Sequence, residues 1–192
     1  MQNVTDQIRN PFGMRPDCPS FVPGYGDANA DFHVVGDRPG VHGGTAAVPR
    51  EGDPTATDPI RADRTFLSYL HLCASEEPPD EDAYADMERF FDAELRAIAA
   101  HVLLPVGARA TEHVFETYTA RTRKTEIDID ALHGEELLGA GWLVVPVKDP
   151  ADWADGDADR LVTALGELRS TDFRRESDLG RFVAGDEPYL VR

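Results

Sequence analysis

The residues best suited to chemistry lie where a short apolar strand pattern ends in a glycine-rich turn. Residues 31–35 have the pattern of a buried strand, and the turn of residues 36–44 follows. Asp37, Arg38 and His42 give this turn a carboxylate, a guanidinium and an imidazole. A carboxylate can orient a water molecule, and an imidazole can exchange a proton near neutral pH. An ordinary turn explains the same residues, with Asp37 as a capping carboxylate and His42 as a solvated loop histidine.

The glycines of this turn predict an unusual backbone. Gly36, Gly40 and Gly43 allow a positive φ angle or a close approach of the backbone to a ligand. In an open α/β sheet, ligands bind outside the carboxyl ends of the strands. We therefore expect the backbone amides of the turn to be candidates for binding a phosphate or a carbonyl oxygen.

Apolar periodicity predicts the elements that must position this turn. We expect strands over residues 31–35, 102–106, 125–129 and 142–147, and helices over residues 63–72, 80–100, 108–118 and 157–168. Residues 1–26 mix proline and glycine and predict an irregular N-terminal arm, whereas residues 154–192 hold the last helix and a loosely patterned tail. The alternation predicts the α/β class: a single three-layer domain over residues 1–192, with a central, mostly parallel sheet flanked by helices.

The charge of the chain is strongly acidic. The formal net charge is −17 and the pI is near 4.6, which ordinarily argues against a polyanionic partner such as DNA. Lys124 and Lys148 are the only lysines, and the acidic residues are scattered along the chain. This composition is typical of proteins kept soluble in concentrated salt, so we infer a halophilic source. A mesophilic acidic protein is the alternative.

The apolar runs and the cysteines indicate where the protein is located and which cofactors it can bind. No run approaches the ~18 apolar residues of a spanning helix, and no basic segment followed by an apolar run opens the chain, so we expect a cytoplasmic protein without a membrane partner. Cys18 and Cys73 are the only cysteines, too few for a disulfide framework or a four-thiolate metal site. We expect a monomer with no metal site.

The order of motifs resembles the uracil-DNA glycosylase superfamily, and more closely its thermophile and archaeal branch. The segments that carry the resemblance are Pro-Gly-Tyr-Gly at 23–26, Val-Val-Gly-Asp-Arg-Pro-Gly at 34–40, Val-Leu-Leu-Pro-Val-Gly-Ala-Arg-Ala at 102–110 and Val-Val-Pro-Val-Lys-Asp-Pro at 144–150. The first two are similar to the branch's first motif, in which a strand ends in Gly-Glu-Ala-Pro-Gly. The last occupies the place of its second motif, a strand followed by His-Pro.

Three positions depart from the pattern of the family. The family histidine that faces the uracil carbonyl falls on Asp149, the expected asparagine on Tyr69 and the stacking aromatic on Arg50. A carboxylate at Asp149 would repel the developing uracil anion unless it were protonated or paired with Lys148.

The iron–sulfur cluster of the family needs four cysteines. Cys18 and Cys73 can stand for two of them, whereas the last aligns with Met87 and the first finds no cysteine near Met14 or Arg15. Two thiolates cannot hold the cluster, so we expect none and no other cofactor.

The resemblance implies a uracil-DNA glycosylase-like protein that hydrolyses the N-glycosidic bond of uracil or another damaged base in DNA, in base excision repair. Asp37 would orient a water molecule or stabilise the cationic sugar, and His42 would donate to a phosphate or to the leaving base. The residues expected to bind the substrate are Gly36, Arg38, Pro39, Gly40, Gly43, Arg50, Tyr69, Lys148 and Asp149.

Two other functions fit the same residues. The replaced histidine, asparagine and aromatic are consistent with a catalytically lapsed module of the same fold that binds nucleic acid or a protein. The third and least favoured hypothesis is an unrelated hydrolase that uses Asp37 and His42.

Overall fold

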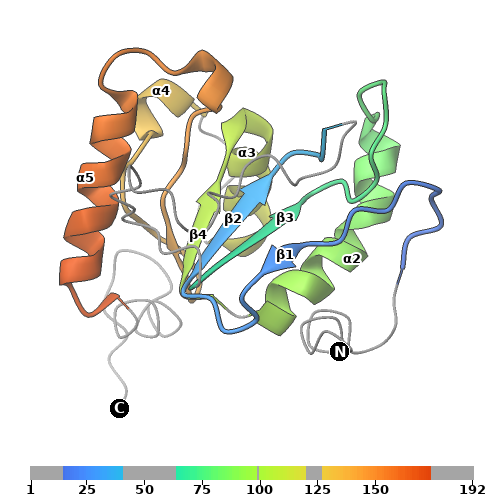
Figure 1. Cartoon of the computed structure of the whole chain (residues 1–192), viewed down its shortest axis with the longest axis horizontal. Helices are drawn as coiled ribbons and strands as arrows, with labels where there is room; N and C mark the ends of the chain where they lie inside the picture. The colour runs from blue at the N-terminus through green and yellow to red at the C-terminus, as the bar shows by residue number, and fades with distance from the viewer. Residues whose placement is uncertain (1–14, 41–63, 99, 120–126, 174–192) are drawn as a thin grey trace, which may run out of the picture. The chain divides into compact units, whose positions relative to one another are not determined.

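The computed structural model describes residues 15–40, 64–98, 100–119 and 127–173 (Figure 1). The chain divides into two compact units, Met1–Ala100 and His101–Arg192. The single domain over residues 1–192 stays a prediction. His42, Gly43 and Arg50, which the sequence proposed as site residues, lie outside the described residues.

The first unit combines three strands with one long helix. Its elements are β1 (Tyr25–Gly26), β2 (Phe32–Gly36), β3 (Thr65–Tyr69) and α2 (Glu81–Ile98). β3 lies between the other two strands, parallel to β2 and antiparallel to β1. α2 packs against β3 (Figure 1).

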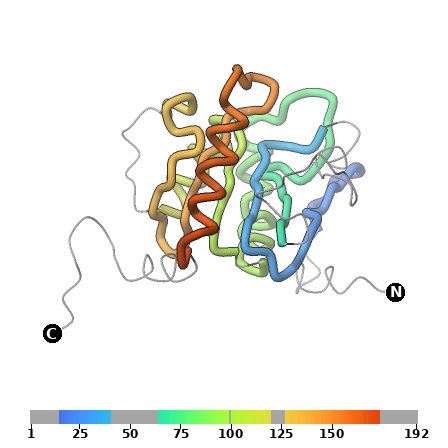
Figure 2. The backbone as a smooth tube through the Cα atoms, turned by 60° about the vertical axis from the view of Figure 1, so that its left-hand side comes forward, coloured from blue at the N-terminus to red at the C-terminus, as the bar shows by residue number. Residues whose placement is uncertain are grey.

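The second unit begins with a strand, a helix and a parallel strand. Its elements are β4 (Val102–Pro105), α3 (Gly107–Tyr118), α4 (Ile129–Leu132), β5 (Leu137–Leu138), β6 (Leu143–Val144), the 3-10 helix η3 (Pro150–Asp152) and α5 (Asp157–Ser170). β6 pairs in parallel with β4 and antiparallel with β5. Figure 2 traces this unit from the yellow-green β4 to the red-orange α5.

The mixed α/β class predicted from the sequence is therefore confirmed, because both units combine strands with helices and each unit contains a parallel strand pair, β2 with β3 and β4 with β6. Strands β2, β4 and β6 and helices α2, α3 and α5 all fall within the predicted segments or within a few residues of them.

The predicted helix over residues 63–72 is wrong, because this segment forms β3. Phe66, Leu67 and Leu70 have a spacing that suits a helix, but threonine, phenylalanine and tyrosine favour strands. The register with β2 runs over five positions, from Phe32 opposite Thr65 to Gly36 opposite Tyr69. This long-range pairing supplies the backbone hydrogen bonds that a helix would otherwise make.

The predicted edge strand over residues 125–129 is also wrong where it can be seen. Residues 125 and 126 lie outside the described residues, and Ile129 begins α4. The side chain of Asp128 accepts a hydrogen bond from the Ala131 amide at 3.1 Å, so it caps the helix.

The irregular arm predicted over residues 1–26 is partly ordered by pairing. Phe21 forms an antiparallel bridge with Cys73, and β1 adds to the edge of β3. Phe21 and Val22 pack on the cluster of Tyr69, Leu72 and Phe90. The Tyr25 side chain is 65% exposed.

None of the helices in the described part of the chain is long and apolar enough to cross a membrane.

Candidate active site

Asp37 lies directly after β2, and His71 lies just beyond the end of β3. Two backbone hydrogen bonds continue the parallel pairing past the strands, from the Leu70 amide to the Gly36 carbonyl and from the His71 amide to the Asp37 carbonyl, both at 3.0 Å. The two chain segments therefore leave the sheet side by side. This holds Asp37 and His71 at the carboxyl ends of neighbouring parallel strands, where α/β proteins bind ligands.

A tyrosine from α2 completes the group. The hydroxyl of Tyr84, in the first turn of the helix, donates a hydrogen bond of 2.6 Å to Oδ1 of Asp37. The rings of His71 and Tyr84 meet edge to face, with 5.7 Å between their centres. We call Asp37, His71 and Tyr84 the Asp37 cluster; it joins side chains from three segments of the first unit.

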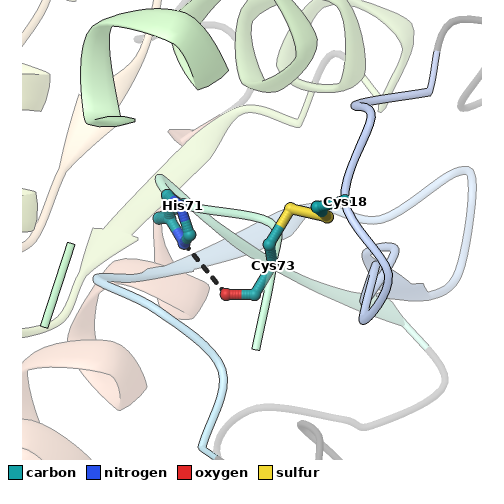
Figure 3. Close-up of a disulfide and its surroundings, with 3 residues drawn as sticks. All are labelled: Cys18, His71 and Cys73. Atoms are coloured by element: carbon teal, nitrogen blue, oxygen red, sulfur yellow. Dashed lines mark hydrogen bonds between the residues drawn. A yellow bond between two sulfur atoms is a disulfide. The ribbon is translucent and has the colours of Figure 1, made fainter. Parts of the chain in front are cut away.

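The tautomer of His71 follows from its partner. Nδ1 lies 2.9 Å from the carbonyl oxygen of Cys73, and a carbonyl can only accept a hydrogen bond (Figure 3). Nδ1 therefore carries the proton. In the neutral ring, Nε2 then has a lone pair that can accept a proton or a hydrogen bond.

Cys73 is bonded to Cys18 of the N-terminal arm, which the sequence did not predict. The Cα atoms of the pair are 6.3 Å apart, and no cysteine of the chain is free (Figure 3). Neither sulfur is a thiolate in this state. A cytoplasmic protein keeps such a bond rarely, and then usually for a catalytic or redox-sensing purpose.

Gly36 and Tyr69 are brought together as register partners. A Cβ atom added to Gly36 would lie 2.9 Å from Cδ1 of Tyr69, which is closer than real Cβ atoms approach a carbon. Tyr69 is buried with Leu72 and Phe90, and burial raises the pKa of its phenol. Glycine at position 36 therefore makes room for the Tyr69 ring.

Of the two alternatives that the sequence allowed for Gly36 and Gly40, a positive φ angle or a close approach to a ligand, the first does not occur. Neither residue has a positive φ angle, and a Cβ atom at Gly40 would meet nothing within 4 Å. Arg38 is half-buried, Pro39 is buried and Gly40 is exposed, so this turn passes from the interior to the surface within three residues.

Lys148 and Asp149 belong to the second unit and have their own partners. Nζ of Lys148 lies 2.7 Å from Oδ1 of Asp130 and 3.3 Å from Oδ2 of Asp157. The hydrogen bond with Asp130 raises the pKa of Lys148 against an opposing effect of burial. A hydrogen bond from the Ala154 amide, followed by the Lys148 contact, lowers the pKa of Asp157.

Asp149 is exposed and caps the short helix η3. Its Oδ1 accepts a hydrogen bond of 2.9 Å from the Ala151 amide. The pairing with Lys148 that would neutralise this carboxylate is not made, because Lys148 bonds to Asp130 and Asp157 instead.

The turn after β6 is held by a buried histidine. His133 is 1% exposed; its Nδ1 accepts from the Lys148 amide at 3.0 Å, and its Nε2 donates to the Asp157 carbonyl at 2.9 Å. The Trp153 indole donates to the Lys148 carbonyl at 2.8 Å. These contacts fix the backbone of the turn, which gives His133 a structural role.

Sequence reasoning missed two members of the Asp37 cluster. Tyr84 follows the apolar periodicity of the helix predicted over residues 80–100, and this pattern accounts for its ring but not for its hydroxyl. His71 lies within residues 63–72, which we predicted to be helical, so the sequence did not associate it with Asp37. A correct strand prediction would have aligned His71 with Asp37, since parallel strands end at the same edge of a sheet.

A carboxylate, a phenol and an imidazole together suit proton transfer and the orientation of a water molecule. Within the described ranges, no group of three histidine, cysteine or acidic side chains could hold a metal ion. The hydrogen bond from the Tyr84 hydroxyl fixes the orientation of the Asp37 carboxylate. A carboxylate must be held in one orientation if it is to position a water molecule or stabilise a developing cation.

Comparison with known proteins leaves the family open. No protein-family model matches the chain, and no curated protein shows significant similarity to it.

Proposed function

We propose that this protein is a uracil-DNA glycosylase-like enzyme that hydrolyses the N-glycosidic bond of uracil or another damaged base in DNA. The observation that carries the proposal is the position of Asp37, immediately after β2 and oriented by Tyr84 at 2.6 Å. The family resemblance puts the polar residue of the first motif at this position. The parallel pairing of β2 with β3 and of β4 with β6 supports an α/β fold of that kind.

The chemistry asked of the Asp37 cluster has two parts. As the bond between base and sugar breaks, positive charge develops on the sugar, and a carboxylate next to it lowers the barrier. The same carboxylate can orient the water that attacks the sugar. The His71 ring packs against the Tyr84 ring, and His71 is our candidate for the role that the sequence gave to His42.

The proposal extends to the setting of the enzyme. It includes the three-layer fold, DNA as partner, a monomeric state, a halophilic cytoplasm and a mechanism without an iron–sulfur cluster. Arg38, Pro39 and Gly40 continue the turn from Asp37 and remain our candidates for contact with the DNA backbone.

An oligonucleotide assay tests the proposed reaction. Purified protein in molar KCl is incubated with duplexes that contain uracil, hypoxanthine or xanthine, and abasic sites are revealed by alkaline cleavage. We expect cleavage at one or more of these bases. Intact strands for all three would refute the enzymatic function.

One observation favours a second candidate, a non-catalytic nucleic-acid-binding or protein-binding module. Where the family has a catalytic histidine, Asp149 is exposed and its carboxylate caps η3. Gel shifts with abasic and mismatched duplexes distinguish the two functions: binding without base release supports the module, and binding with base release supports the enzyme.

A further inference from the structure

The Cys18–Cys73 disulfide lies two residues along the chain from the Asp37 cluster. The Cys73 carbonyl accepts a hydrogen bond from the His71 ring at 2.9 Å (Figure 3). The His71 amide in turn donates to the Asp37 carbonyl at 3.0 Å. A displacement of Cys73 would therefore be transmitted to Asp37 through two hydrogen bonds of His71, one made by its ring and one by its backbone amide.

The disulfide also fastens the arm to this segment. The Val22 amide donates to the Leu72 carbonyl at 2.8 Å, and the Ala74 amide donates to the Ser20 carbonyl at 2.9 Å. These bonds form a short antiparallel contact around the Phe21–Cys73 bridge. Cys18 belongs to the arm and Cys73 to the segment after β3, so the disulfide links the two sides of this contact covalently. The two residues are 55 positions apart in the sequence.

We propose that the Cys18–Cys73 disulfide is a redox-sensitive brace that regulates the Asp37 cluster: its reduction loosens the arm and, through His71, the position of Asp37. The regulatory consequence rests on the proposed function of that cluster, whereas the structural change does not. Because cytosolic thiols reduce accessible disulfides, the bond would report the redox state of the cell.

The chemical step is a thiol–disulfide exchange with a dithiol reductant. A thiolate of the reductant attacks Sγ of Cys18, which is the more exposed residue of the pair, and Cys73 leaves as a thiolate that takes up a proton. The second thiol of the reductant then attacks the mixed disulfide and releases Cys18 as a thiol. Two electrons and two protons pass from the dithiol, which becomes a disulfide.

Amide hydrogen exchange, followed residue by residue by NMR, tests the brace without reference to catalysis. The protein is compared before and after treatment with dithiothreitol, together with the Cys18→Ser/Cys73→Ser variant. We expect the Val22, His71 and Ala74 amides to exchange about tenfold faster after reduction. The Val145 amide, which donates to Leu103 within the second unit, is the internal reference and should not change. The double-serine variant should match the reduced protein and should not respond to dithiothreitol.

Two outcomes would overturn the brace. Unchanged exchange at His71 after confirmed reduction would show that the bond does not hold the cluster. An equal acceleration at Val145 would show that the bond serves global stability and not the site. Base release, measured in parallel, should slow upon reduction. Failure of the proposed glycosylase function would appear as no release in either redox state and would leave the exchange result valid.

Discussion

At the scale of single residues, His33 of β2 has the most strongly shifted pKa for which a value can be given among the described residues. Its side chain is completely buried, Nε2 lies 2.6 Å from the Ser68 hydroxyl, and Nδ1 has no hydrogen-bond partner. Desolvation lowers the pKa of this imidazole to about 3. A buried neutral histidine makes stability depend on pH in a calculable way.

We predict that the fold loses stability in acid because of His33. Folded His33 stays neutral to about pH 3, while the unfolded imidazole binds a proton below about pH 6.5, so the unfolded state gains protons as the pH falls through this window. The cost should reach on the order of 3 kcal/mol at pH 4. Urea unfolding of wild type and His33→Gln between pH 7 and pH 4 measures it. Parallel stability curves for the two proteins would contradict the assignment.

Gly36 allows a second prediction at this scale. Gly36→Ala should destabilise the first unit by about 1 to 3 kcal/mol, because its Cβ atom would overlap the Tyr69 ring. Gly40→Ala, in the same turn but with nothing within 4 Å of its Cβ atom, is the matched control and should change stability by less than about 0.5 kcal/mol. Equal midpoints in urea for the two variants would show that the Tyr69 ring moves aside.

At the scale of elements, the N-terminus of α2 controls where Tyr84 stands. The Asp80 carboxylate accepts a hydrogen bond of 2.9 Å from the Ala83 amide, and the Asp80 carbonyl accepts one of 3.2 Å from the Tyr84 amide. The first turn of the helix is therefore tied to the residue before it. Tyr84 reaches Asp37 from that turn.

Asp80→Ala should cost about 1 kcal/mol, which is typical for the loss of a side-chain cap. It should also loosen Tyr84, visible as faster exchange of the Tyr84 amide. Asp86→Ala, at an exposed position in the second turn of the same helix, removes the same charge without removing a cap. If both variants unfold at the same urea concentration, the cap does not stabilise the helix.

The length of a helix or strand decided whether it could be predicted from the sequence. Long periodic segments such as α2 and α5 were predictable, because their apolar spacing repeats over several turns. β3 was not, since five residues carry little periodicity and the strand exists through its pairing with β2.

The candidate site divides in the same way. Asp37 could be identified from the turn that contains it. The contact of Tyr84 with Asp37 and the Cys18–Cys73 bond could not be predicted. The first joins residues 47 positions apart and the second joins residues 55 positions apart, so both depend on the fold.

At the scale of the whole molecule, the net charge of −17 sets the expected response to salt. Mutual repulsion of the acidic side chains weakens the folded state, and salt screens it, with a Debye length of about 10 Å at 0.1 M and about 3 Å at 1 M. We predict that Tm rises from 0.1 M to 2 M KCl, by about 2 to 4 °C for each kcal/mol of relieved repulsion. Differential scanning calorimetry at several KCl concentrations measures this rise. A flat or falling Tm would contradict the halophilic interpretation.

The central claim is that the Asp37 cluster carries out base release, and single-turnover kinetics on the duplex that wild type cleaves tests it most directly. Asp37→Asn should slow base release by at least about 100-fold, because it removes the negative charge of the carboxylate. Tyr84→Phe should slow base release by about tenfold, because it removes only the hydrogen bond that orients this carboxylate. Tyr25→Phe removes a hydroxyl from an exposed ring and is the matched control. We predict unchanged release for this control. Release by Asp37→Asn at the wild-type rate would contradict the account.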